Sequence, residues 1–544
     1  NKIYNSLNEA FSSVTDNTKT TIELLKDVNM VNKLSISDSK NIILDLKGHN
    51  IKSYVDENFI SNNGIFVVTD SSDEKGSISG YTSNLINNNG IAKVMNGATI
   101  KNLKNDEASD VILNNNKFTL DNSKIVDNSS HNSSNGIKNN GEFIIENNTK
   151  TENVTFINSE NATLNLIDGE LTSTNTDVIQ NSGNFKMEGG TIKNSTGSGI
   201  INNKTGNLNI TGGNISGSSK SIFNHGNGTI ENVIIGAEID QFYNDKPNNA
   251  IYNGIVSDDG NLTLKNNNVN AYYNAISVKE TAIVTVIGGN YVHLGNTNYS
   301  AISIDKGQLN IENNANITSN SDGILVSNNN SQILNIKSAN IKTTSDNNYA
   351  VKTSSSNATI TIGENDDAVN NSLVTITGGK NGLYNASTST VNYYDGVIKG
   401  YSEAISGTIT DTPVGYEIIK ENYEENGVVR EKAYLDRLPV AQIGETKYYS
   451  LQDAIDAVGA EETEIDLVRK ITILSTADPV VIPEGKKINL DLNGYVIDAN
   501  NKDSITNNGT LTITDSKAID ECNSYIQSAT TNMILNNGTL NILR

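Results

Sequence analysis

Short runs of alternating aliphatic and polar residues recur along most of the chain, and turns rich in asparagine and glycine separate them. The stretch 199–215, GIINNKTGNLNITGGNI, shows one period: Ile200, Leu208, Ile210 and Ile215 fall in the alternating runs, and Asn or Gly occupies the turns between them. Alternation of this kind predicts short strands that each bury one face. Each period is therefore predicted to form strand, turn, strand, turn.

The same period returns, with changes, from near residue 60 to near residue 405. A small residue followed by an aliphatic one opens each copy, at spacings of about 22 to 32 residues. These openings are Gly64-Ile65, Gly90-Ile91, Gly136-Ile137, Gly199-Ile200, Ser221-Ile222, Ala250-Ile251, Ala275-Ile276, Ala301-Ile302, Gly323-Ile324, Ala350-Val351, Gly382-Leu383 and Ala404-Ile405. A unit of this size cannot bury its apolar face alone, so the copies must stack on one another.

Stacked copies of this length predict a β-solenoid. A leucine-rich repeat would require a Leu-rich consensus with a helical segment, and a propeller blade would require about 40 residues; neither matches. We therefore predict an all-β fold, a parallel β-helix of about 15 coils in its first solenoid, right-handed because parallel crossovers have that hand. Asparagine suits this fold because it tolerates the left-handed backbone region at tight turns, and identical Asn side chains on successive coils can hydrogen-bond in ladders.

A second solenoid is predicted in tandem because the sequence of the first coils returns near the other end. Residues 6–11, SLNEAF, carry the capping-box pair Ser6 and Glu9 and predict a short amphipathic α-helix that covers the open end of the solenoid. SLQDAI at 450–455 repeats this helix, and LDLNG at 490–494 repeats an earlier LDLKG. The predicted domains are a first parallel β-helix with an N-terminal capping helix at 1–410, a linker that could form a β-hairpin at 411–440, and the start of a second β-helix, truncated in a strand-like run, at 441–544.

Three of the repeated motifs are similar to those of a known family. The YxSLxxAI helix, the LDLxG strand and the NNGTLTITDS turn resemble the pectate-lyase-like right-handed parallel β-helix modules of large bacterial surface proteins, which are often described as adhesive domains. The resemblance covers nearly the whole chain, and its motifs are structural coils and caps. It implies a secreted or wall-attached bacterial protein, and it implies no reaction.

Charge and composition narrow the choice of partners. The formal net charge is −22 with no basic block, so nucleic acid and anionic membrane surfaces are poor partners. The single Cys522 excludes an internal disulfide framework and a cysteine-based metal site. No run approaches 18 apolar residues, so this segment is not expected to insert into a membrane. The chain begins at Asn1 without Met or a signal peptide, and we expect it to be a mature or trimmed piece of a longer protein.

Candidate catalytic residues are sparse, although the fold often carries polysaccharide lyases and hydrolases. A pectate-type lyase needs a cation, usually Arg, as its base, and the first solenoid contains no Arg. The pairs Asp258-Asp259 and Asp366-Asp367, together with His225, lie in polar turns or loops, where a structural role is the simpler interpretation. Neither an EF-hand loop nor a GGxGxD repeat occurs, so we expect no cofactor and no metal site beyond adventitious calcium. The chain is predicted not to be an enzyme.

Aromatic residues are densest between residues 242 and 299. Tyr273 and Tyr299 each stand two residues before an aligned Ala, in YNAIS and YSAIS, so successive coils would place one above the other. Stacked exposed rings could bind sugar rings or a protein, and the alternative is a structural stack that stiffens one corner. The insertion 236–249 could flank such a platform, and Phe242 and Tyr291 lie nearby. The predicted ligand-binding residues are Tyr243, Tyr252, Tyr272, Tyr273 and Tyr299.

Together these features predict a non-catalytic extracellular protein, secreted or attached to a bacterial surface, that acts as an adhesin or stalk and binds a glycan or a host surface protein. Two alternatives stay open. One is a self-assembling fibre or surface-layer subunit that binds copies of itself, because open solenoid ends pair readily. The other is a polysaccharide lyase or hydrolase, in which Lys could replace Arg.

Overall fold

The computed structural model describes residues 2–543 except 82–83, 104–109, 128–135, 175–176, 237–252, 296–298, 329, 366–368, 387, 474–478, 500–502, 518–523 and 529–531. Nearly all regular structure in the described part is β-strand, and its two helices are α1 (Leu7–Ser13) and α2 (Leu451–Ala457). The chain divides into two compact units. The first unit comprises Asn1–Thr412 and Ile419–Leu435, and the second comprises Pro413–Ile418 and Asp436–Arg544.

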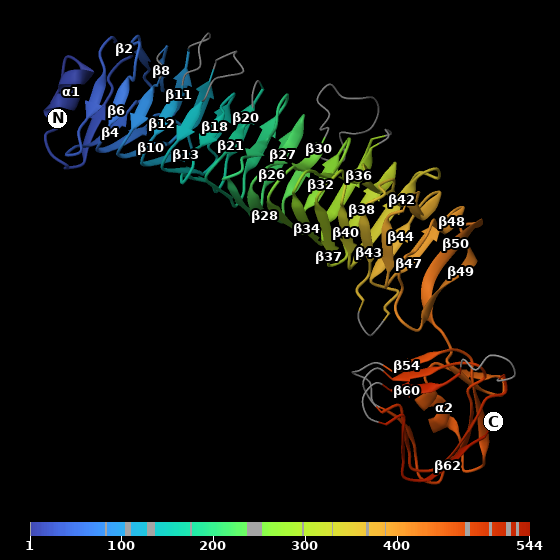
Figure 1. The fold of residues 1–544 in the computed structure, drawn as a ribbon. Helices are drawn as coiled ribbons and strands as arrows, with labels where there is room; N and C mark the ends of the chain where they lie inside the picture. The colour runs from blue at the N-terminus through green and yellow to red at the C-terminus, as the bar shows by residue number, and fades with distance from the viewer. Residues whose placement is uncertain are drawn as a thin grey trace. The chain divides into compact units, whose positions relative to one another are not determined.

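Each coil of the first unit contributes one strand to each of three parallel sheets, as the stacked arrows of Figure 1 show. The sheets, with their first and last coil strands, are sheet A, from β1 (Thr20–Glu23) to β46 (Thr390–Tyr393); sheet B, from β2 (Val28–Met30) to β47 (Val397–Gly400); and sheet C, from β3 (Leu34–Ile36) to β48 (Glu403–Ser406). Sheets A and C have 16 strands each, and every third strand of the chain belongs to the same sheet. This arrangement confirms the predicted all-β parallel solenoid; its right hand stays a prediction.

The stretch that shows the period most clearly in the sequence forms one complete coil. It supplies β24 (Ile200–Asn202) to sheet C, β25 (Asn207–Ile210) to sheet A and β26 (Asn214–Gly217) to sheet B. Ile200 pairs with Ile179 in the coil before and with Ile222 in the coil after. Like residues therefore stack in columns, and alternate residues of each strand are buried inside the coil.

A column of buried asparagines runs along sheet C. In every neighbouring pair the Nδ2 of one side chain donates to the Oδ1 of the next, at 2.7–2.8 Å. Buried amides are tolerated only when they are hydrogen-bonded, and here each side-chain amide donates to the next one in the column. The members are Asn62, Asn88, Asn114, Asn139, Asn158, Asn181, Asn202 and Asn224. The predicted asparagine ladder is thus confirmed.

Two long strands follow the last coil of the first unit. β49 (Tyr416–Glu425) and β50 (Val428–Arg437) pair with each other, and β50 lies antiparallel on β47. The turn between them has positive φ at Asn426 and Gly427, a backbone conformation that these two residue types tolerate best. The predicted linker 411–440 therefore contains a β-hairpin, and its residues 419–435 group with the first unit.

The described part of the second unit forms three coils with sheets of the same kind (Figure 1). Its strands are β51 (Ala441–Ile443), β52 (Thr446–Tyr448), β53 (Thr463–Leu467), β54 (Ile471–Ile473), β55 (Val480–Ile482), β56 (Lys487–Asp491), β57 (Ile497–Ala499), β58 (Ile505–Asn507), β59 (Thr510–Thr514), β60 (Ile526–Ser528), β61 (Ile534–Asn536) and β62 (Thr539–Ile542). A separate hydrophobic core runs through these coils.

The starts of the two units use the same local contacts. The side chain of a serine N-cap accepts a backbone N–H at the start of each helix. Lys40 donates to the backbone oxygen of Phe11 in α1 at 2.8 Å, and Lys486 donates to that of Ile455 in α2 at 2.7 Å. Repeated sequence thus produces repeated contacts, whereas closure of the solenoid ends by these helices stays a prediction.

Asp110 gives the first unit a testable pH dependence. Burial raises the pKa of this carboxyl from its ordinary 3.8 to about 6, and the positive charge of Lys138 only partly opposes the shift. Because the folded-state pKa lies above the unfolded one, the stability that this group contributes is full below pH 3.8 and is lost as the pH rises through about 6. We expect Asp110→Asn to raise the melting temperature at pH 7.5 and to leave it unchanged near pH 4. A shift of equal size at both pH values, measured by circular dichroism, would refute this assignment.

Candidate aromatic binding surface

Tyr273 and Tyr299 lie at the same corner of two successive coils. Tyr273 follows β32 (Asn268–Ala271) and Tyr299 follows β35 (Asn290–His293). The strands that come after the two tyrosines pair in register, so their spacing in the sequence brings the rings together. The ring centroids lie 4.0 Å apart with 17° between the planes. The predicted stack forms, while its role in ligand binding stays a prediction.

Part of this stack is accessible. Tyr299 is 42% exposed, whereas Tyr272 and Tyr273 are half-buried, and the ring of Tyr272 lies 6.1 Å from that of Tyr273. Nothing fits between rings 4.0 Å apart, so a ligand would contact ring edges, hydroxyl groups and the outer face of Tyr299. In the next coil the equivalent position is held by Ser321, whose short side chain cannot cover a phenol ring.

Buried polar groups hold the backbone at the corner that carries Tyr273 and Tyr299. The Nδ2 of Asn274 donates to the backbone oxygen of Ser300 at 2.7 Å and so joins the two coils. His293 is fully buried, and its Nδ1 contacts the backbone oxygen of Tyr273. Burial lowers the pKa of His293, so the imidazole is neutral at pH 7. These contacts are structural, and they hold the tyrosines in place.

Tyr291, the remaining aromatic residue in the described part of this region, does not join the tyrosine surface. Tyr291 is fully buried and pairs with Val269 and Ile317 in a core column, because its place in β35 points inward. Burial raises the pKa of its phenol well above the ordinary range. Tyr243 and Tyr252 lie outside the described residues, as does the insertion from residue 237 onward. Of the predicted ligand-binding residues, the described structure therefore brings together Tyr272, Tyr273 and Tyr299.

A second exposed tyrosine pair lies near the start of the first unit. Tyr54 and Tyr81 are about half exposed, their rings lie 6.4 Å apart, and the Nζ of Lys52 lies 5.3 Å from both ring centroids. The rings raise the pKa of Lys52, chiefly through its contact with Tyr54. The strands before the two tyrosines pair in register, so the coil period could have predicted this pair.

A third aromatic group lies on later coils of sheet C. The rings of Tyr349 and Tyr384 stack at 4.5 Å, and the Nζ atoms of Lys352 and Lys380 lie 5.0 and 5.7 Å from the Tyr349 ring. In the register of sheet C, Tyr384 pairs with Lys352 and not with Tyr349. The coil period therefore does not predict this stack.

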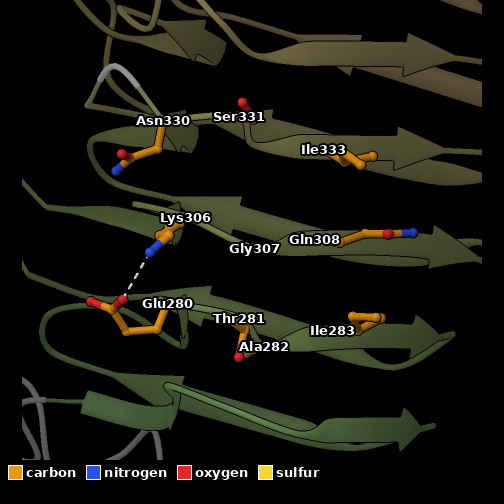
Figure 2. A pocket seen from close by; sticks show the side chains of 10 residues that line it. All are labelled: Glu280, Thr281, Ala282, Ile283, Lys306, Gly307, Gln308, Asn330, Ser331 and Ile333. Carbon is orange, nitrogen blue, oxygen red and sulfur yellow. Dashed lines mark hydrogen bonds and ion pairs between the residues drawn. The ribbon is translucent and has the colours of Figure 1, made fainter.

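A shallow groove of about 500 Å³ crosses three coils at another corner (Figure 2). Glu280, Lys306 and Asn330 stand one above another on successive coils along its side, and Glu280 and Lys306 form an ion pair at 3.1 Å. Ile283 and Ile333 contribute apolar surface. The groove combines this ion pair with mixed polar and apolar walls, and none of Tyr272, Tyr273 and Tyr299 lines it.

The candidate catalytic residues are held by structural contacts. Asp259 accepts a hydrogen bond from the hydroxyl of Thr281 at 2.7 Å, which lowers the pKa of its carboxyl. His225 lies 3.9 Å from Asp258 and against the ring of Phe223. A carboxyl with a lowered pKa is a poor general acid at neutral pH. Asp366 and Asp367 lie outside the described residues.

One group of carboxylates in the second unit has oxygens close enough to share a cation. It consists of Glu464, Asp466 and Asp491. Protein donors already occupy two of the three, because Asp491 accepts the backbone N–H of Asn493 and Asp466 accepts the amide of Gln442. Clustered acidic residues were not predicted here, since they come from two different coils.

Comparisons with known proteins do not bear on this surface. No family model matches the chain, and no curated protein or solved structure matches it. Within the described ranges, neither helix is long or apolar enough to cross a membrane.

Proposed function

We propose that this chain is a non-catalytic extracellular protein, an adhesin or stalk, that binds a surface glycan through Tyr272, Tyr273 and Tyr299. The observation that carries the proposal is the stacked pair Tyr273 and Tyr299, of which Tyr299 is 42% exposed. An aromatic face packs against the C–H groups of a sugar ring, and phenol hydroxyls can bond its hydroxyls. The stack sits on coils that are held together by continuous backbone ladders, so its geometry is preorganised.

The resemblance of the coil and helix motifs to modules of bacterial surface proteins supports the proposed location, secreted or attached to the cell surface. The acidic character of the chain also fits an exposed surface protein, because a net charge of −22 keeps molecules apart. The hydrogen bond from Thr281 to Asp259, which lowers the pKa of that carboxyl, favours binding over catalysis by Asp259.

A binding screen tests the proposal. Wild type and the double variant Tyr273→Ala/Tyr299→Ala are applied to arrays of glycans and of host surface proteins, with folding checked by circular dichroism. We expect the double variant to bind its glycan at least about tenfold more weakly, because aromatic anchors at the centre of a contact carry much of the binding energy. The matched control is Tyr54→Ala/Tyr81→Ala, which removes two exposed tyrosines elsewhere and should bind normally.

Two outcomes would count against this proposal. Unchanged glycan binding by the Tyr273→Ala/Tyr299→Ala variant would show that the stack only stiffens the corner. Binding to a host protein alone would assign the surface to a protein ligand.

A further inference from the structure

We propose that the glycan bound at the tyrosine surface, formed by Tyr272, Tyr273 and Tyr299, is acidic, and that its carboxylate or sulfate group binds the ammonium group of Lys380. This inference rests on the proposed function, because it names the class of glycan and adds one contact to the same site. Two observations carry it. Lys380 lies in the same column of turn residues as the stacked tyrosines, and its positive charge has no acidic partner among the described residues.

One column of turn residues connects the tyrosine stack with Lys380. Sheet C aligns five aliphatic residues of successive coils, namely Ile276, Ile302, Ile324, Val351 and Leu383. The residues three positions before them in the chain are Tyr273, Tyr299, Ser321, Asn348 and Lys380. These residues follow one another along the corner that precedes sheet C. With a strand spacing of about 4.8 Å, Lys380 lies three coils, or roughly 14 Å, beyond Tyr299.

Hydrogen bonds hold the part of this column between Ser321 and Lys380 in place. The backbone N–H of Lys380 donates to the backbone oxygen of Asn348 at 2.9 Å. The Nδ2 of Asn348 donates to the Oγ of Ser321 at 3.4 Å and to the carboxylate of Asp322 at 3.0 Å. The separation of Tyr299 and Lys380 is therefore set by stacked coils, and a ligand that spans it would meet a preorganised surface.

An aromatic ring of the preceding coil holds the ammonium group of Lys380. Its Nζ lies 5.7 Å from the centroid of the Tyr349 ring, and this ring stacks on that of Tyr384 at 4.5 Å. A cation near the face of an aromatic ring is attracted by the ring's quadrupole. Tyr349 belongs to the coil before that of Lys380, on the side of Tyr299, so this attraction draws the ammonium group toward the tyrosine surface.

Two ammonium groups lie near the Tyr349 ring, and only one of them has a carboxylate partner. The Nζ of Lys352 lies 5.0 Å from the ring centroid and pairs with Asp322 at 3.2 Å. Asp322 is only 7% exposed, and it also accepts the backbone N–H of Tyr349 at 3.0 Å. Lys380 is exposed, and no carboxylate within the described ranges forms an ion pair with it. The two lysines and Asp322 therefore leave one positive charge for an anion.

The two ends of the column define the ligand. Ser321 leaves the outer face of Tyr299 uncovered, and that face suits the C–H groups of a sugar ring. Lys380 suits a carboxylate or sulfate, because hydrogen bonds between ionised groups are roughly twice as strong as neutral ones. A separation of roughly 14 Å exceeds the width of one sugar ring. The ligand is therefore an oligosaccharide whose acidic group lies on a different sugar from the one that packs on Tyr299.

Acidic oligosaccharides and their uncharged counterparts test this inference on the full chain. The probes are a hyaluronan hexasaccharide with its carboxyl-reduced form, and a keratan sulfate hexasaccharide with its desulfated form, so carboxylate and sulfate are tested separately. We expect wild type, in isothermal titration calorimetry, to bind at least one acidic form about tenfold or more tightly than its uncharged counterpart. Lys380→Gln should bind the two forms equally.

Lys193→Gln is the matched control. Lys193 is an exposed lysine of β23 (Thr191–Asn194) in sheet B, so its replacement changes the net charge by the same amount at a distant place. This variant should keep the preference of wild type for the acidic form. A loss of preference in Lys193→Gln equal to that in Lys380→Gln would assign the effect to net charge and overturn the inference.

The tyrosine variant separates this inference from the proposed function. Tyr273→Ala/Tyr299→Ala should weaken binding of both the acidic and the uncharged form. If it does so while wild type binds both forms equally, or while Lys380→Gln keeps the preference, the role of Lys380 is wrong and the proposed function stands. Unchanged binding by the tyrosine variant would overturn both. Failure of wild type to bind either acidic hexasaccharide would overturn the acidic class alone, because the glycan array tests the tyrosine surface independently.

Discussion

Replacing Asn202 with Ala should lower the free energy of unfolding of the first unit by roughly 3 kcal/mol, since it breaks a fully buried ladder. The Nδ2 of Asn202 donates to Asn224 at 2.8 Å and to the backbone oxygen of Gly206 at 3.2 Å, and its Oδ1 accepts from Asn181 at 2.8 Å. Alanine would remove the donor to the buried Oδ1 of Asn224, and an unsatisfied buried group costs about 1–3 kcal/mol. Asn181 and Gly206 would each lose one hydrogen bond and keep others. The effect extends to both neighbouring coils because Asn202 accepts a hydrogen bond from Asn181 in one coil and donates one to Asn224 in the other.

The adjacent Asn203 supplies a matched control. Its amide bonds the hydroxyl of Ser182 at 2.9 Å on the outer side of the turn, where water can replace the lost partner. Asn203→Ala should therefore cost less than about 1 kcal/mol. Urea denaturation followed by circular dichroism gives both values, and hydrogen exchange locates the loss in the coils around residue 202. Equal losses of unfolding free energy for the two variants would show that the buried ladder contributes no more to stability than the outer hydrogen bond of Asn203.

Replacing Phe143 with Ala should destabilise the first unit by about 3–5 kcal/mol, the usual range for emptying a buried aromatic site. Phe143 is fully buried, its ring stacks on that of Phe118 at 5.1 Å and 4°, and it meets Phe156 edge-on at 5.8 Å. The core within one coil is narrow, so neighbouring side chains have little freedom to collapse into the space. Both the lost burial and the cavity contribute.

Phe223 provides the comparison for this variant because it lies on the outside of sheet C. Its ring is half-buried and contacts Lys220 and His225. Phe223→Ala should cost about 1 kcal/mol or less, measured by the same denaturation. If Phe143→Ala were as mild as Phe223→Ala, the inward column of aromatic residues would not be the stabilising core.

The coil architecture could be predicted because its determinants are local and repeated. Ile200 and its partners share a spacing that sets the register, and the period of the asparagines places them in one column. The stack of Tyr273 on Tyr299 followed from the same spacing. Features that obey the coil period can be predicted from the sequence, because the position of a residue in one repeat gives the position of its counterpart in the next.

Features that break the period could not be predicted. Tyr291 obeys the period, in one column with Val269 and Ile317, but whether that column faces the core or the solvent depends on the residue at which its strands begin. The stack of Tyr349 on Tyr384 joins different coil positions through side-chain packing.

Capture of glycans on immobilised protein, followed by mass spectrometry of what is eluted, tests the proposed function most directly. Wild type and Tyr273→Ala/Tyr299→Ala are exposed to the same defined pool of acidic and neutral oligosaccharides. Binding without cleavage through the tyrosine stack predicts that wild type returns its ligand at full mass and that the double variant returns little or none. Recovery of shortened or unsaturated fragments, or equal recovery from both proteins, would contradict it.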